Sequence, residues 1–144
     1  FSNFFPLSLS QPVFELRIGF YNLRQRLQEE FADAAYGVLC REYLSAVMLI
    51  RDPDLAINKI ADGDTIFLNG RLICMSGDLE KILEKIPPNG IAVKGGYVVA
   101  AKLSAEAAAD FARYIRKRIG EDSITKLCKE LKSYVQEKKK IIFI

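Results

Sequence analysis

The stretch Pro6-Leu7-Ser8-Leu9-Ser10-Gln11-Pro12, which runs on through Glu15-Leu16-Arg17-Ile18-Gly19, carries the most information about the fold of this chain. Each proline fixes its own φ and restricts the residue before it, so both ends of a short serine-rich run are held. A core strand does not accommodate two prolines and a glycine at this spacing, and a flexible linker does not carry so many apolar residues. The sequence therefore predicts an ordered, extended loop that leads through a glycine into a helix.

The composition is that of a single globular domain. A chain of 144 residues is long enough to bury one core, and its 50% hydrophobic and 27% charged content is ordinary. The net charge of +3 arises from 21 basic and 18 acidic residues, which is too small an excess to indicate nucleic-acid binding. The longest apolar run, residues 44–50, is too short to span a bilayer, so no membrane partner is expected.

Cysteine and histidine usage limits the chemistry. The three cysteines are odd in number and lack C-x-x-C spacing, which predicts free thiols and a cytoplasmic location. The chain has no histidine, so a Ser-His triad, a histidine base and a histidine metal site are excluded. Any chemistry must use carboxylates, Lys, Arg, Tyr or backbone amides.

Periodicity predicts strands that alternate with helices. Leu23 and Leu27 recur at helical spacing after Gly19, and residues 43–50 favour a helix over a strand. Asp78 is the expected N-cap of a helix over residues 78–86, and Ser104 of one that ends at Gly120. The remaining elements are strands at 36–40, 65–68, 71–75 and 141–144, a hairpin of 91–93 with 97–103, and a helix from Asp122 or Ser123. This alternation predicts an α/β domain with a mixed sheet flanked by helices.

Two motifs resemble the signature segments of sugar-phosphate nucleotidyltransferases. In that family a Gly-rich phosphate loop precedes a Pro-Leu-Thr-x-x-x-Pro stretch and a helix opened by glycine, and the matching residues here are Pro6, Leu7, Ser8, Pro12 and Gly19. A second family signature is a strand ending in Asn-Gly-Asp, whose aspartate holds Mg²⁺, followed by a helix that starts Asp-Leu. Residues 65–70 and Asp78-Leu79 are similar to it.

The departures from the family pattern identify a divergent branch. The Gly-rich loop would precede Phe1, its last Thr-Arg positions fall on Ser2 and Asn3, and a family lysine falls on Val13. The metal-binding aspartate falls on Arg71. The combination of Gln11-Pro12, Arg17, Gly19 and Asn69-Gly70-Arg71 resembles nucleotidyltransferases in which such a domain precedes a left-handed β-helix acyltransferase-like half.

The resemblance also implies a domain organisation and a set of partners. Residues 1–144 would form a single α/β domain, similar to the front part of a Rossmann-like nucleotidyltransferase domain and belonging to the N-terminal part of a longer protein. Its ligands would be a nucleotide and a sugar phosphate, and a homo-oligomer would form through the C-terminal half.

The resemblance assigns phosphate binding to Arg17, Gly19, Asn69, Gly70 and Arg71, and a signature loop to Pro6, Leu7, Ser8, Gln11 and Pro12. It assigns no catalytic residue and no metal ligand. At 4 Å and an effective dielectric of about 20, a pair of unit charges interacts by ~4 kcal/mol, and a divalent ion doubles that. Arg71 therefore repels Mg²⁺, which is expected only if its ligands lie outside this chain. A guanidinium can instead bind phosphate bidentately, and Arg17 lies near a helix N-terminus that favours anions.

Simpler interpretations stand beside this one. Arg71 can be a solvated arginine, Arg17 can pair with Glu15 or a neighbour, and Asn69-Gly70 can be a hairpin turn. Three functions follow. The first is a nucleotidyltransferase that forms a nucleotide sugar from an NTP and a sugar 1-phosphate, with the isolated chain inactive. The second is a non-catalytic, regulatory module that binds nucleotide or sugar phosphate. The third is a scaffold for an acyltransferase half, docked through residues 141–144.

Overall fold

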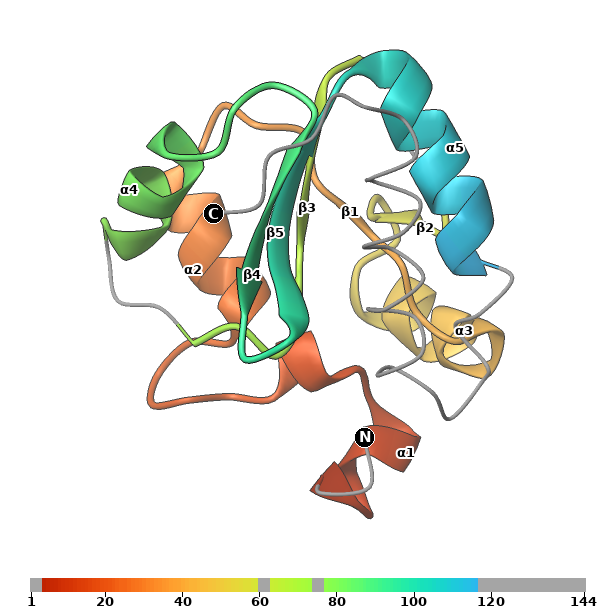
Figure 1. The fold of residues 1–144 in the computed structure, drawn as a ribbon. Helices are drawn as coiled ribbons and strands as arrows, with labels where there is room; N and C mark the ends of the chain where they lie inside the picture. The colour runs from red at the N-terminus through yellow and green to blue at the C-terminus, as the bar shows by residue number, and fades with distance from the viewer. Residues whose placement is uncertain (1–3, 60–62, 74–76, 117–144) are drawn as a thin grey trace. The chain divides into compact units, whose positions relative to one another are not determined.

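A computed structural model describes residues 4–59, 63–73 and 77–116 (Figure 1). They divide into two compact units. We call residues 4–59 with 70–73 the βαβ unit, and residues 63–69 with 77–116 the hairpin unit, each from the elements it contains. Among the described residues, the chain passes directly from the hairpin unit into the βαβ unit between Asn69 and Gly70. The elements expected beyond residue 116, including the end at Gly120, the helix from Asp122 or Ser123 and the strand at 141–144, lie outside the described residues.

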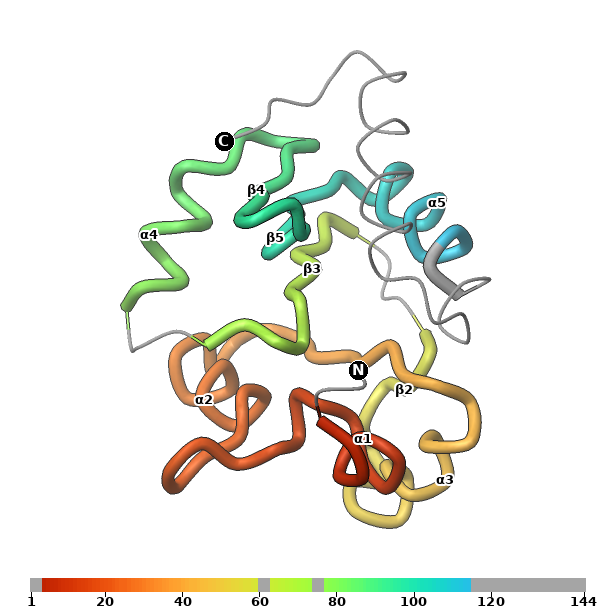
Figure 2. Tube along the Cα trace, turned by 60° about the horizontal axis from the view of Figure 1, so that its bottom comes forward, coloured from red at the N-terminus to blue at the C-terminus, as the bar shows by residue number. Residues whose placement is uncertain are grey.

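The hairpin unit contains a three-stranded antiparallel sheet. Its strands are β3 (Thr65–Leu68), β4 (Gly90–Lys94) and β5 (Tyr97–Leu103), in the order β3-β5-β4. The predicted hairpin of β4 with β5 is confirmed, with Gly90 opposite Lys102 and Lys94 opposite Tyr97. The helices α4 (Asp78–Glu84) and α5 (Ala105–Arg116) lie on opposite sides of this sheet (Figures 1 and 2).

The core of the hairpin unit follows from simple periodicity. On α5, Ala108, Phe111 and Ala112 recur at i, i+3 and i+4 and are all buried. Phe111 meets Phe67 of β3 edge-on, with ring centroids 4.7 Å apart and planes at 66°. The buried cluster is apolar throughout, and its members are Ile91, Ala101, Leu103, Ala108 and Phe111.

The βαβ unit takes its name from a short parallel pair with a helical crossover. β1 (Gly37–Val38) pairs with β2 (Ala56–Ile57), and α3 (Glu42–Arg51) connects them. The helical interpretation of residues 43–50 is thus confirmed. Before this crossover come α1 (Leu7–Ser10), the 3₁₀ turn η2 (Val13–Glu15) and α2 (Leu23–Glu30). A small core of Val38, Cys40, Leu44, Met48 and Leu55 closes the unit.

Several local predictions are wrong. Residues 7–10 are a helical turn rather than an extended run, because Pro6 takes the N-cap position and Ser10 Oγ donates to the Leu7 carbonyl at 3.1 Å. Gly77, not Asp78, is the N-cap of α4. Residues 71–73 form no strand, and β3 pairs with β5, so Asn69-Gly70 is not a hairpin turn.

The predicted α/β class is confirmed. Parallel and antiparallel pairings both occur, and within the described ranges they lie in two separate sheets. None of the helices in this part of the chain combines the length and apolar composition that a bilayer crossing requires.

Candidate functional site

The first signature segment ends in a tight loop, residues 16–21. The loop begins after η2 at Glu15 and ends before Asn22, the N-cap of α2. Within it the Ile18 amide donates to the Tyr21 carbonyl at 3.1 Å, and Gly19 makes the turn at a φ of +76° that other residues rarely adopt. The Phe20 side chain at the turn is 92% exposed. The glycine therefore shapes this loop, and the helix begins only after it.

Arg17 lies on this loop and is exposed. It forms no ion pair or hydrogen bond with another described residue. The alternative of a pair with Glu15 is wrong, because other side chains bind both Glu15 carboxylate oxygens. Arg17 therefore presents a guanidinium to solvent from a short, turned loop.

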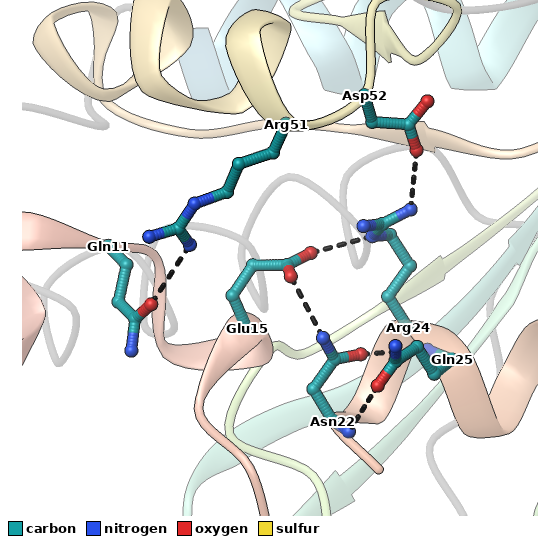
Figure 3. Close-up of polar contacts among 7 residues, drawn as sticks. All are labelled: Gln11, Glu15, Asn22, Arg24, Gln25, Arg51 and Asp52. Atoms are coloured by element: carbon teal, nitrogen blue, oxygen red, sulfur yellow. Dashed lines mark hydrogen bonds and ion pairs between the residues drawn. The ribbon is translucent and has the colours of Figure 1, made fainter.

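Glu15 is the centre of a buried polar network that sequence analysis did not find (Figure 3). Arg24 Nε donates to Glu15 Oε1 at 2.6 Å, and Asn22 Nδ2 donates to Glu15 Oε2 at 2.9 Å. Arg24 Nη1 also donates to Asp52 Oδ2 at 2.7 Å. Burial alone lowers the pKa of the Arg24 guanidinium, but the hydrogen bonds and charges of Glu15 and Asp52 raise it above its ordinary value. The network joins the first signature segment to α2 and to the end of α3.

Asn22 also closes the N-terminus of α2. Its Oδ1 accepts from the Gln25 amide at 2.8 Å, and Gln25 Oε1 accepts from the Asn22 amide at 3.1 Å, which completes a capping box. Two of the amides that a phosphate would use at this helix end are thus already bonded. The helix N-terminus therefore offers fewer free amides to an anion than the sequence suggests.

The second signature segment is divided between the two units. In the hairpin unit, the Asn69 amide donates to the Val99 carbonyl at 2.9 Å and Asn69 Nδ2 donates to the Val98 carbonyl at 2.8 Å. These bonds fix the end of β3. In the βαβ unit, Gly70 lies directly against Phe14 of the first segment, since a Cβ on Gly70 would be 3.0 Å from Phe14 Cδ1. Arg71 follows and is exposed.

Both segments line one small hollow in the βαβ unit. Its walls are Ile18 and Leu23 from the first segment and α2, Leu72 and Ile73 from the second segment, and Arg26. Arg26 Nη2 donates to the Ile18 carbonyl, which holds the loop against this wall. The space inside it is only about 10 Å³, which is about the room that one water molecule needs and far below the roughly 300–1,000 Å³ of a typical ligand pocket. The hollow is therefore a shallow depression that does not enclose a ligand.

The remaining residues of the predicted signature loop have different surroundings. Ser8 and Pro12 are buried, whereas Pro6 and Leu7 are exposed. Gln11 Oε1 accepts from Arg51 Nη1 at 3.0 Å (Figure 3). Gln11 therefore connects this segment to the last residue of α3.

The residues around Arg71 do not suit Mg²⁺. Magnesium in proteins prefers carboxylate and other oxygen ligands, and a guanidinium in the position of the family's aspartate supplies the wrong charge. Across residues 4–59, 63–73 and 77–116, no three His, Cys, Asp or Glu side chains gather into a metal-binding group. We therefore derive no chemical step through a metal ion at this place.

Comparison with known proteins agrees with the two signature segments. A model of the sugar nucleotidyl transferase family matches residues 1–142. The chain belongs to this family. No curated protein and no solved structure matched the chain. The family match thus extends over nearly the whole sequence of this α/β chain, well beyond the two signature segments.

Proposed function

We propose that this domain belongs to a sugar-1-phosphate nucleotidyltransferase that forms a nucleotide sugar from an NTP and a sugar 1-phosphate. In this reaction a sugar phosphate oxygen attacks the α-phosphorus of the NTP, the α–β bridging bond breaks, and pyrophosphate leaves. Such a transfer depends on positioning the phosphates and neutralising the charge on their oxygens. Exposed arginines on rigid loops are suited to both tasks.

The observation that carries the proposal is the exposed Arg17 on a loop that lines the same hollow as the second segment. Gly70 packs on Phe14 of the first segment, and Ile18 and Leu72 line one hollow. In the sequence, Arg17 directly precedes Ile18 and Arg71 directly precedes Leu72. Two exposed arginines on segments that share a hollow favour a phosphate ligand, because each guanidinium offers a planar pair of donors to phosphate oxygens.

The proposed phosphate-binding set remains Arg17, Gly19, Asn69, Gly70 and Arg71. In it the two arginines would touch the ligand, whereas the two glycines shape the loops that carry them. Asn69 would act by fixing the end of β3. We further propose that the domain lies in the cytoplasm and functions in a longer protein with an acyltransferase-like half. On this view the isolated chain binds ligand without turnover, because its hollow is too small to enclose the reacting groups.

A second candidate is a non-catalytic module that binds nucleotide or sugar phosphate. The guanidinium of Arg71 at the family's metal position favours it. Pyrophosphate exchange distinguishes the two functions when measured on the full-length protein. A transferase exchanges labelled pyrophosphate into the NTP only when the sugar 1-phosphate can react, and a binding module shows binding without exchange.

Calorimetric titration tests ligand binding by the domain. The titrants are UTP, dTTP and glucose 1-phosphate, and the variants are Arg17→Gln and, as a matched control, Arg113→Gln on the exposed surface of α5. Loss of a charged hydrogen bond costs about 1.5–3 kcal/mol, so Arg17→Gln is expected to weaken binding roughly tenfold or more. Arg113→Gln is expected to leave it unchanged. Equal affinity of Arg17→Gln and wild type for these ligands would show that Arg17 does not bind them.

A further inference from the structure

Loop 16–21 is fixed at both of its ends by one side-chain network. At the start of the loop, the residue Glu15 is 8% exposed, and both oxygens of its carboxylate accept hydrogen bonds. At the end, Asn22 donates to that carboxylate while it caps α2. The residue before the loop is thus bonded directly to the residue after it, which closes the loop at its base.

Arg24 connects this closed loop to the rest of the βαβ unit. Its guanidinium bonds Glu15 through Nε at 2.6 Å and Asp52 through Nη1 at 2.7 Å. Its side chain is 15% exposed, and those of Glu15 and Asp52 are 6% and 32% exposed. Asp52 directly follows Arg51, the last residue of α3. Arg51 in turn bonds Gln11 of the same signature segment (Figure 3). The end of α3 therefore holds the segment at two points.

A single lysine could not reproduce this arrangement. Arg24 uses two different nitrogens of a rigid planar group for two carboxylates, whereas an ammonium is a point charge on a flexible stem. Arg24 has no exposed donor surface comparable to that of Arg17, so it is not placed to bind a ligand itself. Arg24 can instead determine the position of the loop. The exposed Arg17 is on this loop, two residues after Glu15.

We propose that Arg24 is a positioning residue: by bridging Glu15 and Asp52 it holds loop 16–21 in the conformation in which Arg17 binds a phosphate group of the ligand. The inference rests on the proposed function, because it assigns Arg24 to the same phosphate-binding site. Pre-ordering a loop reduces the entropy lost on binding, and removal of the bridge restores that loss.

The experiment is a double-mutant cycle with ligand affinity as its readout. The variants are Arg24→Lys, Arg17→Gln and the double variant, with Arg24→Gln as a second removal of the bridge. Arg41→Gln is the matched control, since Arg41 donates to the Tyr43 hydroxyl on α3. Each is titrated with glucose 1-phosphate and UTP, and circular dichroism with urea unfolding shows which variants are folded.

If Arg24 acts through Arg17, the two effects are not additive. Arg24→Lys is expected to weaken binding about tenfold in a folded protein, and to cause no further loss in the Arg17→Gln background. Additive losses would instead assign Arg24 a separate role and overturn the inference, as would unchanged affinity in folded Arg24→Lys and Arg24→Gln. A loss of the same size in Arg41→Gln would also overturn it.

Limited trypsin digestion provides a readout that needs no ligand. With the loop held by the bridge, cleavage after Arg17 is slow in wild type and is expected to become severalfold faster in Arg24→Gln while cleavage after Arg113 is unchanged. Equal rates after Arg17 would contradict the inference. If wild type binds neither ligand, the proposed function is wrong. If wild type binds ligand and the Arg24 variants bind it with the same affinity, only the role of Arg24 is wrong.

Discussion

The two units of this domain are stabilised by different interactions. In the hairpin unit the core is apolar, with Ile91, Ala101 and Phe111 buried between sheet and helix. The βαβ unit has a smaller apolar core, and its first segment is held by charged groups at Glu15, Arg24 and Asp52. The exposed loops with Arg17 and Arg71 belong to the unit whose first segment is held by polar contacts. A polar network can hold a loop in a defined conformation at the surface, whereas an apolar core would bury the side chains of the loop.

The largest effect is expected from the apolar side of this comparison. Phe111→Ala removes a side chain that is 5% exposed and contacts Phe67, and such truncations cost about 3–5 kcal/mol. Urea unfolding measures this change. Phe20→Ala is the matched control, because Phe20 is 92% exposed and its loss is expected to stay within about 0.5 kcal/mol. Similar costs at both positions would contradict the assigned core.

Breaking the polar network is expected to be nearly as costly. Arg24→Met leaves the buried Glu15 carboxylate with only Asn22 as a partner, and an uncompensated buried charge costs about 3 kcal/mol or more. The double variant Glu15→Leu/Arg24→Met removes both charges and is expected to be more stable than Arg24→Met alone. Urea unfolding of wild type and both variants checks the order. If the single variant were as stable as wild type, the network would contribute no rigidity to the first segment.

A smaller effect is expected where the two signature segments meet. In Gly70→Ala the new methyl group would lie 3.0 Å from Phe14 Cδ1, and overpacking of this kind costs about 1–3 kcal/mol. The cost should fall when Phe14 is shortened, so thermal unfolding of Gly70→Ala is compared in the wild-type and Phe14→Leu backgrounds. An identical cost in both would show that Gly70 does not contact Phe14.

The smallest effect concerns pH and the core of the βαβ unit. Burial, and to a lesser extent the charge of Glu42, raises the pKa of the Cys40 thiol above its usual value. The unfolded chain then loses this proton first, so the contribution of Cys40 to stability is complete below the ordinary thiol pKa of about 8.5 and declines as pH rises through the folded pKa. Wild type should lose more stability than Cys40→Ala between about pH 7 and about pH 10. Parallel curves would contradict this.

How much the sequence could predict differs between the units in the same way. The hairpin of β4 with β5 and the buried face of α5 follow from spacing between near neighbours, and both were predictable. The partners of Arg24 are 9 and 28 residues away along the chain, and no periodic signal connects such positions. Residues 7–10 were mispredicted because local hydrogen bonds from Ser10 and to Pro6 decided their conformation. A buried glutamate two residues before an exposed arginine gives no signal in the sequence alone.

The central claim is that phosphate is bound by protein cations with no metal at the position of Arg71. Calorimetric titration of the domain with glucose 1-phosphate, once in EDTA and once in Mg²⁺, tests it most directly, because this ligand coordinates the ion weakly in solution. We predict equal affinity under the two conditions, and loss of binding in Arg17→Gln and in Arg71→Gln under both. Binding that requires Mg²⁺, or that survives both substitutions, would contradict the account.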